Sequence, residues 1–170
     1  LSALPTSHNL NVGMVGMHGN YGPNILTNKC DLLIAIGMRF DDRVTGDPKT
    51  YASQAKIIHL DIDPAEINKN IITDVPVIGD CKESLKLITK KIEMKSHSKW
   101  ISKFDDLMKI EFEKVIKTDL NPSKDGLTMG ESIIAINEYT DGDAIIVTDV
   151  GQHQMVACRS VSYTHLRAHE

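Results

Sequence analysis

The segment Asp31-Leu-Leu-Ile-Ala-Ile-Gly-Met-Arg-Phe-Asp-Asp-Arg-Val-Thr-Gly46 decides the fold class. It begins with a continuous apolar run that a glycine ends, which is typical of a strand buried on both faces of a parallel sheet. Arg39, Asp41, Asp42 and Arg43 follow directly. Ligands of open α/β sheets bind beyond the carboxyl ends of strands, and a guanidinium matches phosphate oxygens, so this charged block is a candidate phosphate site. A solvated surface loop is the alternative, and composition alone favours it.

Two further apolar runs, at residues 56–62 and 75–79, predict two more strands of the same kind. Short helices fit the intervals around them. One is expected at residues 24–28 after Pro23, and another is expected to begin near Pro64, because proline suits the first position of a helix. Strands that alternate with helices indicate an α/β fold with a parallel sheet.

A helix is expected after the third strand, because Asp80 can cap its first turn. Residues 94–117 then form a charged, amphipathic stretch. Apolar residues anchor both segments. They are Leu85, Ile88 and Ile92 in the first segment, and Trp100, Phe104, Leu107, Ile110 and Val115 in the second.

The remaining chain predicts the start of a second α/β unit. Residues 118–126 are rich in helix breakers and predict a linker. A helix at residues 129–138, a turn at Asp141-Gly142 and a strand at residues 144–148 follow. One helix and one strand cannot bury a core, so this unit is expected to need more chain than is present.

Composition excludes several functional classes. The 170 residues are 41% hydrophobic and 25% charged, as in globular proteins of one domain or two small pieces. The net charge of −4 gives no basic surface for nucleic acid, and no apolar run approaches the roughly 20 residues that span a bilayer. The first residues do not form a signal peptide. The three cysteines are widely spaced and fit neither a disulfide framework nor a zinc site, so a reducing, cytoplasmic compartment is expected.

A glycine cluster precedes the first strand, at Gly13, Gly16, Gly19 and Gly22. Glycines let the backbone approach a ligand closely, and His18 adds a polar contact. The spacing is not that of the dinucleotide-binding fingerprint, and a flexible turn is an equal alternative.

Acidic residues end the second and third predicted strands. Asp61 is the candidate partner of a ribose hydroxyl pair, because an acidic residue at a strand end commonly takes that role. Asp63, just before Pro64, fits better as the cap of the next helix. Asp80 repeats the arrangement after the third strand, and plain helix capping explains it at least as well.

The last cluster is Thr148-Asp-Val-Gly-Gln-His-Gln154, where a predicted strand gives way to a helix that begins with Gln152 and His153. The N–H groups at the start of a helix that follows glycine form a natural phosphate site. An ordinary strand–helix turn is the alternative.

Taken together, these motifs resemble acetolactate synthase, also called acetohydroxyacid synthase, over roughly residues 11–159. The resemblance rests on five segments in the same order. They are Gly16-Met-His-Gly19, Gly37-Met-Arg-Phe-Asp-Asp-Arg-Val-Thr-Gly46, Asp61-Ile-Asp-Pro-Ala-Glu-Ile-Asn-Lys-Asn70, Val75-Pro-Val-Ile-Gly-Asp80 and Thr148-Asp-Val-Gly-Gln-His-Gln-Met155. The arginine–aspartate block and Gly-Gln-His-Gln distinguish this family from its relatives.

The resemblance implies an internal fragment of the family's catalytic subunit. Residues 1–93 would be the C-terminal part of a parallel-sheet, FAD-binding middle domain, and residues 94–125 a helical, charged linker. Residues 126–160 would begin the α/β domain that binds thiamine diphosphate. Residues 161–170 do not resemble the family's continuation and are interpreted as an artefactual tail.

The resemblance also implies which residues contact the cofactors. Those for FAD are Met17, His18, Gly37, Arg39, Asp41, Arg43, Asp61, Ile62 and Asp80. Arg43 would also face the substrate channel and hold a keto-acid carboxylate. Gly151, Gln152 and His153 would contact the phosphates of thiamine diphosphate. The family's catalytic glutamate and its Mg²⁺ ligands lie outside this chain, so neither a catalytic residue nor a metal ligand is expected here.

The implied reaction joins two pyruvates, or pyruvate and 2-ketobutyrate, with loss of CO₂, in the synthesis of isoleucine and valine. The expected partners are further full-length catalytic subunits, as a homodimer or homotetramer, and a small regulatory subunit; the chain alone is expected to be inactive. The alternatives are another flavin- and thiamine-dependent enzyme, such as a pyruvate oxidase or glyoxylate carboligase, and a non-catalytic nucleotide-binding module.

Overall fold

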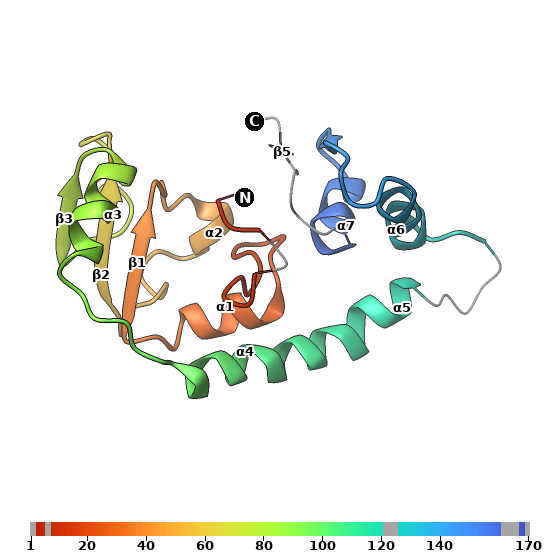
Figure 1. The fold of residues 1–170 in the computed structure, drawn as a ribbon, viewed down its shortest axis with the longest axis horizontal. Helices are drawn as coiled ribbons and strands as arrows, with labels where there is room; N and C mark the ends of the chain where they lie inside the picture. Colours follow the sequence, from red (N-terminus) through yellow and green to blue (C-terminus); the bar gives the residue numbers. More distant parts are fainter. Residues whose placement is uncertain (1–2, 6–7, 121–125, 161–166, 169–170) are drawn as a thin grey trace. The chain divides into compact units, whose positions relative to one another are not determined.

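Three parallel strands form the only sheet of the first half of the described chain: β1 (Leu32–Ile36), β2 (Lys56–Asp61) and β3 (Val75–Ile78) (Figure 1). The sheet order is β1-β2-β3, and Ile58 of β2 pairs with Ile34 on one side and with Val75 on the other. All three strands fall within the predicted runs. The predicted α/β fold with a parallel sheet is therefore confirmed.

The computed structural model describes residues 3–5, 8–120, 126–160 and 167–168. Its contacts divide the chain into two units. One unit is Ile25–Ser98, and the other combines Leu1–Asn24 with Lys99–Glu170. The domain boundaries expected from the resemblance, after residues 93 and 125, stay predictions.

The core of the Ile25–Ser98 unit covers one face of the sheet. Ala35 of β1 and Ile57 of β2 point into it. The chain between β1 and β2, which includes α2 (Asp42–Thr45), and the chain after β2 supply the other buried members. These are Phe40, Tyr51, Ala52 and Ile71.

The opposite face of the sheet is apolar and partly open. Leu32, Ile34 and Ile36 of β1 and Val75 of β3 are all exposed. The prediction that the strands are buried on both faces is therefore wrong for β1 and β3. Both are edge strands, and β2 alone has a hydrogen-bonded neighbour on each side in the described sheet.

The predicted helix at Pro64 does not form, because residues 64–68 make turns. Asp63 Oδ1 accepts a hydrogen bond from the N–H of Ala65 (2.9 Å), which closes a turn at Asp63, and no helix follows for it to cap. Asn68 then takes a φ of +59°, and its side-chain oxygen accepts from the N–H of Thr73 (2.8 Å). A left-handed residue cannot continue a right-handed helix, so the turns stop there.

The predicted cap at Asp80 is confirmed by α3 (Cys81–Thr89). Asp80 Oδ1 accepts a hydrogen bond from the N–H of Glu83 (3.0 Å). Leu85 and Ile88 are half-buried, but Ile92 lies beyond the helix and is exposed. The predicted apolar face is thus wrong at Ile92.

The short helix α1 (Tyr21–Thr27) begins earlier than the predicted residues 24–28. The cause is Glu111, whose carboxylate accepts hydrogen bonds from the N–H of Tyr21 (3.0 Å) and from Asn20 Nδ2 (3.5 Å). Once the first turn has this acceptor, Pro23 lies among the first residues of the helix, whose N–H groups have no partner within the helix. Its missing N–H therefore costs no helical hydrogen bond.

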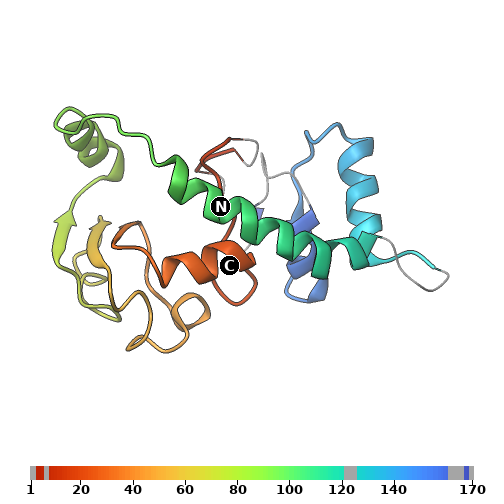
Figure 2. The ribbon, with the colours of Figure 1, turned by 90° about the horizontal axis from the view of Figure 1, so that it is seen from below.

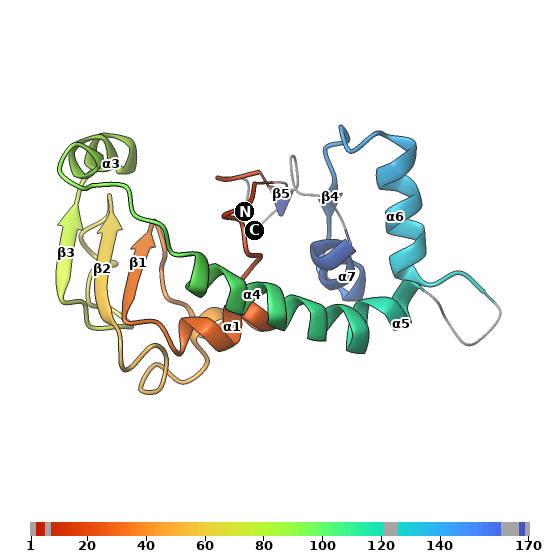
Figure 3. The same cartoon turned by 60° about the horizontal axis from the view of Figure 1, so that its bottom comes forward.

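The amphipathic stretch forms a continuous helical rod of α4 (Ser98–Glu111), a π-helical segment (Phe112–Ile116) and α5 (Lys117–Leu120) (Figure 2, Figure 3). Of the predicted anchors, Trp100, Phe104 and Leu107 are half-buried, whereas Ile110 and Val115 are exposed. Gly22 of α1 lies against this rod, because a Cβ built on Gly22 would sit 3.5 Å from Leu107 Cβ. The rod runs through residues 118–120, so the predicted linker begins too early.

The helix predicted at residues 129–138 is confirmed by α6 (Met129–Tyr139), and its place at the start of a second α/β domain stays a prediction. A capping box fixes its start: Thr128 Oγ1 accepts from the N–H of Glu131 (3.1 Å), and Glu131 accepts from the N–H of Thr128 (2.8 Å). The predicted turn is confirmed by positive φ at Asp141 and Gly142.

The strand after this turn, β4 (Val147–Thr148), is shorter than the predicted residues 144–148 and pairs in parallel with β5 (Arg167–Ala168). The helix α7 (Gln152–Ser160) begins where it was predicted. Of the proposed tail at residues 161–170, only β5 falls within the described residues. In the described parts of the chain, no helix is long and apolar enough to cross a membrane.

We expect Asp74→Asn to destabilise the sheet at neutral pH and to lose this effect in acid. Asp74 accepts hydrogen bonds from Lys56 Nζ (2.8 Å) and from the N–H of Ile57 (2.9 Å). The hydrogen bond from Lys56, followed by that from Ile57, lowers the pKa of this carboxyl below its usual value. A group with a lowered pKa stabilises the fold above its unfolded pKa of about 3.9 and loses that contribution as the pH falls through the folded value.

Thermal unfolding followed by circular dichroism tests this prediction. The gap in unfolding midpoint between the unsubstituted chain and the variant should shrink from about pH 7 to about pH 3. Glu83→Gln, which removes the exposed ion pair to Lys86, is the matched control and should change the midpoint little at any pH. A gap for Asp74→Asn that stays constant into acid would contradict the assignment.

Candidate functional site

The carboxyl end of β1 opens into a turn at Gly37. The N–H of Gly37 donates to the carbonyl of Leu60 (2.8 Å), which holds the turn against β2. The φ of Gly37 is +60°, and a Cβ built there would meet nothing within 4 Å. The turn thus needs glycine for its backbone conformation and leaves open space beside the sheet edge.

Phe40 turns the charged block outward. It adopts a φ of +52° although it is bulky, and its side chain is only 2% exposed. Its ring packs edge-on against His59, with ring centroids 5.0 Å apart, and against Tyr51 at 6.2 Å. Because the ring fills the core, the side chains of Arg39 and Asp41 on either side are left toward solvent. Sequence reasoning treated Phe40 only as part of a motif and missed this anchoring role.

The guanidinium groups of the block have carboxylate partners. Arg39 Nη2 lies 3.7 Å from Asp41 Oδ2, and Arg43 Nη1 donates to Asp42 Oδ1 at 2.6 Å. The side chains of Arg39 and Arg43 are 60% and 71% exposed. The hydrogen bond between Asp42 and Arg43 lowers the pKa of the aspartate and raises that of the arginine. Arg43 therefore stays charged, and both guanidinium groups are accessible to an anion.

The carboxyl end of β2 carries Asp61, whose side chain is 10% exposed. Its Oδ1 accepts from the N–H of Asp63 (2.9 Å), while its Oδ2 lies 3.7 Å from Nε2 of His59. Ile62, the next residue, is 72% exposed. A held carboxylate beside an exposed apolar side chain suits a ribose hydroxyl pair and a flat ring.

The structure brings the predicted FAD residues of this unit to one edge of the sheet. Parallel strands end on the same side, so the residues that follow β1, β2 and β3 share that edge. They are Gly37, Arg39, Asp41, Arg43, Asp61, Ile62 and Asp80. Asp80 already serves as the cap of α3. FAD contains a pyrophosphate, which guanidinium groups bind, and a ribose, whose hydroxyls donate to a carboxylate. This edge of the sheet offers both kinds of group.

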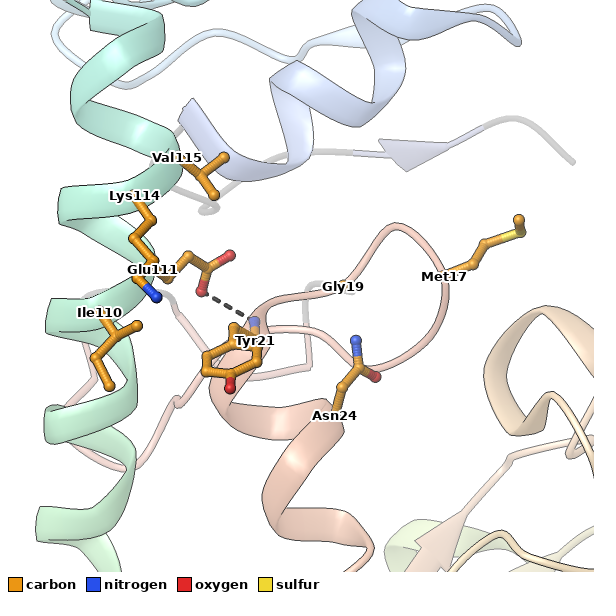
Figure 4. A pocket seen from close by; sticks show the side chains of 8 residues that line it. All are labelled: Met17, Gly19, Tyr21, Asn24, Ile110, Glu111, Lys114 and Val115. Atoms are coloured by element: carbon orange, nitrogen blue, oxygen red, sulfur yellow. Dashed lines mark hydrogen bonds between the residues drawn. The ribbon is translucent and has the colours of Figure 1, made fainter.

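Met17 and His18 belong to the other unit and lie in the loop between Gly16 and Gly19. This loop is closed by hydrogen bonds from the N–H of Gly19 to the carbonyl of Gly16 (2.9 Å) and from the side chain of Asn24 to the same carbonyl (2.8 Å). Met17 is 66% exposed and lines a pocket of about 440 Å³ with residues of the helical rod (Figure 4).

Glu111 also lines this pocket, and its hydrogen bonds join the end of the glycine loop to the rod. It is 6% exposed, and its carboxylate points at the backbone of Tyr21 (Figure 4). Sequence reasoning missed this residue. The signal was present, because Glu111 continues the helical spacing of Trp100, Phe104 and Leu107 and so places an acid on the apolar face of the rod.

The predicted thiamine diphosphate residues meet at the start of α7. Gly151 immediately precedes the helix, and a Cβ built on it would lie 2.8 Å from Cε1 of His153. A side chain at position 151 would therefore displace the imidazole of His153 from its place beside the turn. Asp149 Oδ1 accepts from the N–H of Val150 (2.7 Å) and stiffens the approach to the helix. The first amides of a helix lack intrahelical partners, which fits a phosphate ligand.

Among the described residues, no three histidine, cysteine or acidic side chains are placed to hold a metal ion. The resemblance placed the magnesium ligands elsewhere, and that expectation is not tested by this finding.

Comparison with known proteins bears on the whole chain. Residues 1–88 match the model of a protein family described as the thiamine pyrophosphate enzyme, central domain. This is more than half of the chain. The chain belongs to the thiamine pyrophosphate enzyme family. The matched residues include β1, β2 and β3 and every predicted FAD residue of the sheet edge.

Similarity to curated proteins confirms the resemblance to acetolactate synthase. The chain is 39% identical over 169 residues to the acetolactate synthase large subunit of Lactococcus lactis, covering 98% of this chain and 28% of the relative. It is 42% identical over 156 residues to a probable acetolactate synthase large subunit of Methanocaldococcus jannaschii, covering 89% of this chain and 26% of the relative. It is 40% identical over 174 residues to the chloroplastic acetolactate synthase of Arabidopsis thaliana, covering 96% and 24%. The chain therefore spans about a quarter of the length of these relatives.

We expect Phe40→Gly to destabilise the Ile25–Ser98 unit even though glycine suits a positive φ. Relief of the left-handed backbone returns about 1–2 kcal/mol, whereas loss of a buried aromatic side chain costs about 3–5 kcal/mol. The loss of the buried side chain outweighs the relieved backbone strain, so the free energy of unfolding measured in urea should fall by about 2–3 kcal/mol.

Ala52→Gly is the matched control in the same core. Ala52 has a φ of +46° and is fully buried. Here relief of about 1 kcal/mol is offset by one lost methyl group and a more flexible unfolded chain, so the change should stay within about 1 kcal/mol of zero. Equal losses for the two variants would show that Phe40 is not the anchor.

Proposed function

We propose that this chain is part of the catalytic subunit of an acetolactate synthase. The parent protein would join two pyruvates to 2-acetolactate, or pyruvate to 2-ketobutyrate, with release of CO₂, in isoleucine and valine biosynthesis. The observation that carries the proposal is identity of 39–42% to acetolactate synthases across 89–98% of the chain. The names of these relatives favour this carboligase over a pyruvate oxidase or a binding module.

We assign FAD to the carboxyl edge of the sheet. Arg39 and Arg43 would bind the pyrophosphate, because both guanidinium groups are exposed beside the open turn at Gly37. Asp61 would accept the ribose hydroxyls, and Ile62 would lie against a ring of the cofactor. Met17 and His18 remain predicted flavin contacts from the glycine loop.

We assign thiamine diphosphate to the start of α7, where the backbone of Gly151, Gln152 and His153 would hold its phosphates. When bound, this cofactor stabilises the carbanion that decarboxylation of a keto acid creates. The chain's own contribution would be to orient substrate, with Arg43 holding a keto-acid carboxylate. Magnesium would be bound by residues of the parent protein outside this chain.

The expected assembly is a homodimer or homotetramer of full-length subunits together with a small regulatory subunit. The name "large subunit" of the Lactococcus lactis relative supports a smaller partner for that protein. We place the parent protein in the cytoplasm, since three widely spaced cysteines suit a reducing compartment.

We expect Arg39→Gln, Arg43→Gln and Asp61→Asn each to weaken FAD binding by about 10- to 100-fold. Each variant removes a charge-assisted hydrogen bond worth about 1.5–3 kcal/mol. Quenching of flavin fluorescence on titration with the 170-residue chain measures the affinity. For the two arginine variants, Lys49→Gln is the control of equal charge change, because Lys49 lines a hollow with Lys56 at the other end of β2. The same loss in the control would mean that net charge, and not the sheet edge, determines affinity.

A chimera tests the reaction. Residues 8–160 of this chain replace the matching segment of the Lactococcus lactis large subunit, to which they are about 40% identical. We expect the chimera to form acetolactate from pyruvate only when thiamine diphosphate, Mg²⁺ and FAD are all added. The chain alone should form none, because it spans 28% of that relative.

Product analysis separates the outcomes. Acetolactate, converted to acetoin and assayed by colour, supports the proposal. Oxygen uptake with acetate or acetyl phosphate as product would instead indicate an oxidase. A folded chimera that binds thiamine diphosphate but forms no product would count against the segment belonging to an acetolactate synthase.

A further inference from the structure

His59 is the most deeply buried polar side chain of the sheet. It lies in the middle of β2, is 0% exposed, and faces the core beside Ala35, its partner in β1. Among the described residues, neither ring nitrogen has a hydrogen-bond partner. A buried polar group without a hydrogen-bond partner destabilises the fold, so a fold that needed only bulk here would be more stable with an apolar ring.

The surroundings of His59 show where its polarity is directed. Nε2 lies 3.7 Å from Oδ2 of Asp61, two residues along the same face of the strand. Oδ1 of Asp61 is already held by the N–H of Asp63 at 2.9 Å. The imidazole therefore faces Oδ2, the Asp61 oxygen to which no other described group donates a hydrogen bond.

The ring of His59 is itself held in place. Phe40 packs edge-on against it, with centroids 5.0 Å apart and planes inclined by 79°. Phe40 is the residue that turns the charged block outward after β1. One buried imidazole thus contacts the anchor of the candidate pyrophosphate loop and faces the candidate ribose carboxylate.

We propose that His59 is a positioning residue, which holds the Asp61 carboxylate in the orientation that accepts a ribose hydroxyl pair. This rests on the proposed FAD function of the sheet edge. A small shift of the ring would bring Nε2–H within hydrogen-bonding distance of Oδ2. Bound ligand would then find both carboxylate oxygens fixed from behind, with their remaining lone pairs directed outward.

Two substitutions separate positioning from packing. His59→Phe keeps the aromatic contact with Phe40 and removes both nitrogens, whereas His59→Gln keeps an N–H donor and removes the ring. If His59 positions Asp61, His59→Phe should weaken FAD binding about tenfold without lowering the unfolding midpoint, and His59→Gln should restore much of the affinity. If His59 only packs, the phenylalanine should bind FAD normally and the glutamine should be the poorer variant.

A double-mutant cycle tests whether His59 acts through Asp61. In the Asp61→Asn background, His59→Phe should cause no further loss of FAD affinity, because the group that it positions has gone. Losses that multiply in the double variant would show that the two residues act independently and would overturn the proposal.

Nuclear magnetic resonance supplies a readout that does not depend on FAD. In the unsubstituted 170-residue chain, nitrogen-15 shifts should show the His59 proton on Nε2. The carboxyl-carbon resonance of Asp61 should move in His59→Phe and move less in His59→Gln. An Asp61 resonance that ignores both substitutions overturns the positioning role. If the Asp61 resonance responds but the unsubstituted chain binds no FAD, the proposed function fails while the His59–Asp61 coupling stands.

Discussion

Everything at the sheet edge depends on the conformation of Phe40. A bulky residue at positive φ is strained by about 1–2 kcal/mol, and burial of its ring against His59 and Tyr51 more than offsets this strain. The reversal places Arg39 and Asp41 on the solvent side of the chain. It also keeps α2 close to the end of β1, where Arg43 joins the same charged group. The position of the charges is thus a consequence of a hydrophobic contact.

The Leu1–Asn24 and Lys99–Glu170 unit depends on a different single contact. Glu111 is buried, and its carboxylate meets the first N–H of α1. An acceptor at this point satisfies a donor that a helix start leaves open and fixes the glycine loop that carries Met17. The π-helical segment begins directly after Glu111, and such segments are frequent at functional sites. A polar contact between residues far apart in the sequence therefore holds the start of α1 against the rod.

The sequence predicted the features that depend on neighbours along the chain. The apolar runs became β1, β2 and β3, Asp80 capped α3, and α7 began at Gln152. Features that depend on distant contacts were missed. Strand burial on both faces failed because one face of β1 and β3 is left partly open, the helix at Pro64 failed because Asn68 turns left-handed, and Glu111 was needed to start α1 before Pro23. The site residues of the sheet edge were brought together because parallel strands end on one side, and their ligand roles stay predictions.

The pairing within the charged block bears on how an anion would enter it. Arg39 and Arg43 each face an aspartate, which makes the block close to neutral, yet both pairs are exposed. Exposed ion pairs are worth only about 0–1 kcal/mol, because water screens the attraction and the side chains lose freedom. A pyrophosphate that offers several oxygens to the same planar groups forms shorter, bidentate bonds and exceeds that value. The aspartates therefore do not compete strongly with such an anion for the two guanidinium groups.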